Sequence, residues 1–157
     1  MTNNKTGVNG CTAVCKAIQA HSTIREFYFS NNMIGPDGAK HLAKVLEHAK
    51  YITELWISSN GIFPEGAAAL GKALADKKHL EVLCMKRNDI GIVGCRDLEA
   101  CLQASKTVRV LDLSGNNIGD EGVKLVVNAL SNKPKQNMQA LMLSDNKITS
   151  IGCLLLV

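Results

Sequence analysis

A pattern of apolar residues, asparagine and glycine recurs along the chain and restricts its possible folds more than any other feature. Each copy has alternating apolar residues, then an asparagine and an isoleucine, then a glycine with apolar residues four and eight positions later. Successive copies are 28 residues apart, except that the last step is 30 residues and places a two-residue insertion, with Pro134, in residues 131–137. A fixed period of this length is typical of a solenoid. The copies begin at Ile24, Ile52, Leu80, Val108 and Met138.

The repeat makes one domain of all 157 residues. Residues 1–23 match the second half of a copy, and the last copy lacks its final helical positions. Because solenoid ends need polar caps and residues 151–157 are nearly all apolar, we expect self-association through open ends, a frayed C-terminus, or a longer chain. The expected units are a partial repeat at 1–23, repeats at 24–51, 52–79, 80–107 and 108–137, and a truncated repeat at 138–157.

Each copy predicts a short strand followed by a helix. Apolar residues two apart, such as Phe27 and Phe29, are typical of a strand with one buried face. The apolar pairs four apart predict a helix, and Pro36 and Pro64 suit its first turn. Strand–helix repetition requires a parallel sheet. Strands ~4.8 Å apart beside helices ~8–10 Å apart bend the array, so we predict an α/β solenoid with parallel strands on the concave side and helices on the convex side.

The pattern L-x-x-L-x-L-x-x-N-x-I-x-x-x-G-x-x-x-L-x-x-x-L resembles the leucine-rich repeat in its 28-residue, ribonuclease-inhibitor-like form. The resemblance covers nearly the whole chain and implies a horseshoe segment. One asparagine recurs in every copy, and we interpret it as structural, because a buried amide can satisfy the backbone groups of a sharp turn. These asparagines are Asn4, Asn32, Asn60, Asn88, Asn116 and Asn146.

The concave face carries the candidate site. Tyr28 and Trp56 should lie side by side on neighbouring strands, and we expect Trp56, the only tryptophan, to be exposed. Exposed aromatic residues flanked by charges are typical of interface hot spots, although an ordinary solvated sheet face is the alternative. The candidate partner-binding residues are Glu26, Tyr28, Glu54, Trp56, Cys84, Lys86, Arg87 and Asp112.

The six cysteines are too few for a disulfide scaffold in a chain of this length. We expect Cys84, in mid-strand on the concave face, to be the most reactive thiol. No apolar secretory signal follows Met1, so we predict a cytoplasmic, reducing location. Four other cysteines occupy small apolar helix positions and are expected to be buried and unreactive, namely Cys11, Cys95, Cys101 and Cys153.

Enzyme signatures such as G-x-S-x-G, the P-loop and H-E-x-x-H are absent from the sequence, so we predict no catalytic residue, no cofactor and no metal. A net charge of +4 is too small to indicate nucleic acid, and no apolar run is long enough to cross a membrane. Lysines gather where helices should end, either as an anion-binding edge or, as we favour, to complement helix C-termini. They are Lys50, Lys77, Lys78, Lys106, Lys133 and Lys135.

The expected function is non-enzymatic binding of another protein on the concave face. One alternative is a Ran-type GTPase-activating protein, since those proteins are similar in repeat form. Their activity needs a particular arginine and asparagine on repeat loops, which we could not match here, and usually an acidic tail, which this sequence lacks. Another alternative is the repeat sensor of a NOD-like receptor or part of an axonemal assembly. The fold alone does not separate these.

Overall fold

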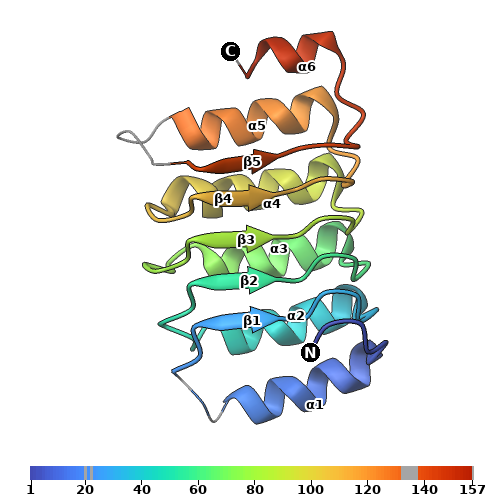
Figure 1. The fold of residues 1–157 in the computed structure, drawn as a ribbon, viewed down its shortest axis with the longest axis vertical. Helices are drawn as coiled ribbons and strands as arrows, with labels where there is room; N and C mark the ends of the chain where they lie inside the picture. Colours follow the sequence, from blue (N-terminus) through green and yellow to red (C-terminus); the bar gives the residue numbers. More distant parts are fainter. Residues whose placement is uncertain (20, 22, 132–137, 157) are drawn as a thin grey trace.

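The computed structural model describes residues 1–19, 21, 23–131 and 138–156. Helices and strands alternate along the chain, as the repeat predicts (Figure 1). The elements are α1 (Gly7–Gln19), β1 (Glu26–Tyr28), α2 (Gly35–Leu46), β2 (Glu54–Trp56), α3 (Phe63–Leu74), β3 (Val82–Cys84), α4 (Gly91–Ala104), β4 (Val110–Asp112), α5 (Gly119–Ser131), β5 (Ala140–Met142) and α6 (Ser150–Leu154).

The strands form one parallel sheet in the order β1-β2-β3-β4-β5, with each strand beside its neighbour in the sequence. The register pairs equivalent residues of successive repeats, such as Phe27 with Leu55 and Leu55 with Leu83. The helices lie behind one face of the sheet, and the two termini are at opposite ends of the stack (Figure 1). The predicted α/β solenoid is therefore confirmed, and we call the face opposite the helices the open face.

The core lies between the sheet and the helices. Leu55 in β2, Ile57 directly after it and Leu70 in α3 are fully buried there. The repeat glycine allows this packing, because a Cβ on Gly94 would lie 2.5 Å from Cγ2 of Ile90 and meet the neighbouring helix as well. No helix in the described part of the chain has the length and hydropathy that a membrane crossing requires.

The asparagine column is structural, as predicted. From Asn32 onward its members are buried, whereas Asn4, next to the N-terminus, is exposed. From Asn32 to Asn146, each side-chain oxygen accepts the backbone N–H of the asparagine one repeat earlier, and the distance from Asn32 N to Asn60 Oδ1 is 2.9 Å. The column therefore joins the turns that follow neighbouring strands.

None of the six cysteines, all of which lie in the described residues, forms a disulfide, and five of them are buried. The prediction of buried helix thiols is confirmed for Cys11, Cys95 and Cys101. It is wrong for Cys153, which is exposed. Cys153 lies on α6, and in the described residues α6 packs against α5 with no further helix on its other side.

The end of the solenoid at α6 exposes apolar side chains. Ile151 is 68% exposed and Leu154 is 75% exposed. This surface is the feature on which the predicted self-association depends. Self-association and the predicted repeat boundaries both stay predictions.

One of the lysines at the helix ends is buried. The side chain of Lys77 is only 3% exposed, and its ammonium lies 3.1 Å from Asp76 Oδ1. The same ammonium donates a hydrogen bond to the backbone oxygen of Glu47, which follows α2, at 3.1 Å. Lys77 therefore complements a helix C-terminus, as favoured from the sequence, although it does so inside the protein. The predicted insertion with Pro134, and also Lys133 and Lys135, lie outside the described residues.

Candidate functional site

Tyr28 and Trp56 face one another at the ends of β1 and β2. They are register partners, and their ring centroids lie 5.9 Å apart with the planes inclined by 21°. Tyr28 is 43% exposed. Trp56 is half-buried, so the predicted exposure of the indole holds only in part, and its ring stacks on Tyr28.

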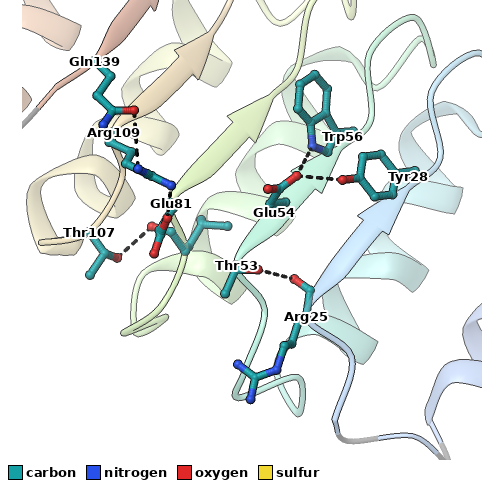
Figure 2. A network of polar contacts seen from close by, with 10 residues as sticks. Arg25, Tyr28, Thr53, Glu54, Trp56, Glu81, Thr107, Arg109 and Gln139 are labelled. Atoms are coloured by element: carbon teal, nitrogen blue, oxygen red, sulfur yellow. Dashed lines mark hydrogen bonds and ion pairs between the residues drawn. The ribbon is translucent and has the colours of Figure 1, made fainter.

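The carboxylate of Glu54 joins the two aromatic residues. Its Oε2 accepts hydrogen bonds from the Trp56 indole N–H at 2.9 Å and from the Tyr28 hydroxyl at 2.8 Å, as Figure 2 shows. The Tyr28 hydroxyl also lies 3.1 Å from Oε2 of Glu26. We call these four residues, Glu26, Tyr28, Glu54 and Trp56, the aromatic–carboxylate cluster.

Hydrogen bonding shifts the pKa values of this cluster in opposite directions. The bonds from Trp56 and then Tyr28 hold the pKa of Glu54 below its ordinary value. The bond to Glu54, with smaller effects from desolvation and Glu26, raises the pKa of Tyr28 to about 12. At neutral pH the cluster therefore combines an ionised Glu54 with a protonated Tyr28.

Cys84 occupies the next strand in the same row, between Trp56 and Asp112. The prediction that it is an accessible, reactive thiol is wrong, because the residue is only 2% exposed. The longer side chains of its two register partners flank it, and burial raises its pKa to about 12. The nearby negative charges of Asp112 and Glu54 act in the same direction.

The remaining predicted site residues lie further along the open face. Asp112 is half-buried, and its Oδ1 accepts the backbone N–H of Ser114 at 2.9 Å. Lys86 is half-buried and Arg87 is exposed, both in the turn after β3. In the described part of the chain, neither makes an ion pair with Glu26 or Glu54.

A row of polar residues immediately before the strands was missed by the sequence analysis. Arg109 binds Glu81 with an N···O distance of 2.6 Å and lies 3.5 Å from the Gln139 side chain (Figure 2). Thr53 Oγ1 donates to the backbone oxygen of Arg25 at 3.0 Å. Opposite charges one repeat apart, at 81 and 109, were the signal that could have found the ion pair.

Comparison with known protein families accounts for this architecture. The family model described as leucine-rich repeat matches residues 48–71, 104–127 and 135–157. These three segments are similar to leucine-rich repeats. The first two matches begin two 28-residue periods apart, in agreement with the register of the sheet. No curated protein matches the chain.

The open face of the sheet presents the aromatic–carboxylate cluster, and Glu54 and Trp56 of the cluster lie in the first matched segment. Leucine-rich repeats generally mediate protein–protein interaction. Among the residues that the structure describes, no three His, Cys, Asp or Glu side chains gather where they could hold a metal ion. What the cluster offers is a rigid aromatic surface with negative charge.

Proposed function

We propose that the chain binds a partner protein on the open face of its sheet, the concave face of the predicted horseshoe, and that the aromatic–carboxylate cluster is the centre of the contact. The stacking of Tyr28 on Trp56, fixed by the shared carboxylate of Glu54, is the observation that carries this proposal. Aromatic side chains held in one geometry lose little conformational freedom on binding. Such residues dominate the binding energy of many interfaces.

The core does not need this aromatic pair. The apolar residues that alternate with this pair, within or directly after the two strands, are Phe27, Phe29, Leu55 and Ile57, and all of them belong to the buried core. Tyr28 and Trp56 therefore cover only the sheet surface. This separation of roles supports a binding function for them.

The test is Trp56→Ala, with the partner first isolated by pull-down from the source cell and identified by mass spectrometry. We expect the dissociation constant to rise by about tenfold or more, while the thermal midpoint barely moves. Tyr28→Ala should weaken binding as well.

Tyr51→Ala is the matched control, because Tyr51 is 45% exposed, lies between α2 and β2, and has ring contacts with His79 and Arg25 instead of the cluster. It should leave the affinity unchanged. A Trp56→Ala variant that loses stability and keeps its affinity would show that the indole only covers the sheet.

We also infer that these repeats are of the ribonuclease-inhibitor-like class and that the chain works in a reducing, cytoplasmic compartment. The regular 28-residue spacing with helices of 12–14 residues in α2 to α5 supports the class. The compartment is supported by a cysteine content that is too low for a disulfide scaffold in a chain of this length. Measuring GTP hydrolysis by Ran with and without the chain separates this proposal from a GTPase-activating role.

A further inference from the structure

The aromatic–carboxylate cluster directs its side-chain hydrogen-bond donors inward. The Tyr28 hydroxyl points to the carboxylates of Glu54 and Glu26, at 2.8 and 3.1 Å. The indole N–H of Trp56 is donated to Glu54 at 2.9 Å. A phenol and an indole have one such donor each, and an ionised carboxylate has none. The side chains of the cluster therefore offer a ligand only acceptor oxygens and ring faces.

One cation lies beside the cluster without pairing with its carboxylates: the Met1 ammonium donates to the backbone oxygen of Tyr28 at 2.8 Å. In the described residues, the ion pairs involve neither Glu26 nor Glu54. The charge of Arg109 acts on Glu54, but its guanidinium is bound to Glu81 at 2.6 Å. The two carboxylates thus remain available to a positive group from outside.

We propose that the cluster receives an arginine side chain of the partner protein, an inference that rests on the proposed function. A guanidinium has five N–H donors and no acceptor, which is the complement of this surface. It binds carboxylates through paired hydrogen bonds and stacks on aromatic faces. Glu26 and Glu54 both lie within hydrogen-bond distance of the Tyr28 hydroxyl, so one planar group can reach both.

The geometry favours arginine over other polar side chains. A lysine ammonium also carries only donors, but it is a compact point charge that cannot pair with two carboxylates through one plane. Amide side chains bring an oxygen for which the cluster has no donor. The chain as a whole has a net charge of +4, so its overall electrostatic field repels a cationic ligand. The preference is therefore a local property of the cluster.

The test is a titration of the full chain with three capped peptides, acetyl-Gly-Gly-X-Gly-Gly-amide, in which X is arginine, lysine or citrulline. The fluorescence of Trp56, the only tryptophan, reports binding at constant ionic strength. Citrulline has nearly the shape of arginine but no charge, and it carries an acceptor oxygen. We expect the arginine peptide to saturate in the millimolar range, with a dissociation constant at least about fivefold below that of the citrulline peptide. The lysine peptide should fall between them.

Glu26→Gln removes one charge from an exposed position while keeping the size of the side chain. It should raise the dissociation constant of the arginine peptide by about threefold or more. The control is Glu121→Gln, an exposed residue in the first turn of α5, which should change nothing. Equal affinity for arginine and citrulline, no saturation up to about 0.1 M, or an unchanged affinity in Glu26→Gln would each overturn the inference.

The failure of this inference can be told apart from the failure of the proposed function. If Trp56→Ala weakens binding of the protein partner but the chain binds the arginine and citrulline peptides equally, the open face binds proteins and the choice of arginine is wrong. If the arginine preference holds but Trp56→Ala leaves partner affinity unchanged, the cluster recognises guanidinium and the proposed interface is wrong.

Discussion

The side-chain oxygen of Asn88 accepts a hydrogen bond from the backbone N–H of Asn60 at 2.8 Å. The amide nitrogen of Asn88 donates to the carbonyls of Ile57 and Met85, each at 2.9 Å. One side chain therefore satisfies three backbone groups that belong to two successive repeats. Because the same arrangement recurs along the column, the turns after the strands form a continuous hydrogen-bonded layer.

Asn88→Leu should lower the free energy of unfolding by about 3 kcal/mol or more, since a leucine of similar size leaves three buried backbone groups unsatisfied. Urea denaturation followed by circular dichroism measures this loss. Asn128→Leu is the control, because Asn128 is exposed on α5 and its replacement should stay within about 0.5 kcal/mol of the parent. Equal stabilities of the two variants would contradict a structural role for the column.

Native protein should show one fast-reacting thiol, Cys153, which is exposed. Burial raises the pKa values of Cys84 and Cys95 to about 12, so their thiolate populations at pH 8 are very small. Counting thiols with a chromogenic disulfide reagent, with and without denaturant, checks this. Cys153→Ser should abolish the fast phase, and a fast phase that survives this change would show that another cysteine is accessible.

Acid should weaken the aromatic–carboxylate cluster. The folded-state pKa of Glu54 lies below its ordinary value of 4.5, so its hydrogen bonds stabilise the fold above the unfolded-state pKa. That stabilisation is lost as the pH falls through the folded-state value. We expect Trp56 fluorescence to change as the pH falls below 4.5, the ordinary pKa of Glu54, with a smaller change in Glu54→Gln. The Glu121→Gln variant should follow the parent, and an identical acid response in Glu54→Gln would refute this assignment.

Lys77→Met should lower the free energy of unfolding by about 1–3 kcal/mol, because it leaves the backbone oxygen of Glu47 without its buried donor. The adjacent Lys78 is exposed, so Lys78→Met should have an effect of less than about 0.5 kcal/mol. Thermal and urea unfolding of the two variants make the comparison direct. If Lys77→Met lowered the free energy of unfolding no more than Lys78→Met does, the buried ammonium of Lys77 would contribute no net stability.

Much of the site could be predicted from the sequence, because residues that are one repeat apart in the sequence lie side by side on neighbouring strands. Residues 28 apart had to become register partners, which placed Tyr28 beside Trp56. The details of contact could not be predicted in this way. The 28-residue period does not determine the side-chain rotamers by which both aromatic residues donate to the same carboxylate oxygen of Glu54.

The sequence by itself determined the solenoid, the order of its strands and the structural role of the asparagines, since each of these depends on residue type at a repeated position. Tertiary structure decided which open-face positions are accessible. Cys84 stands at the same repeat position as Tyr28, yet it is 2% exposed where Tyr28 is 43% exposed. Exposure depends on the size of the neighbouring side chains, and a thiol between Trp56 and Asp112 is covered by them, whereas a phenol at the edge strand extends beyond its surroundings.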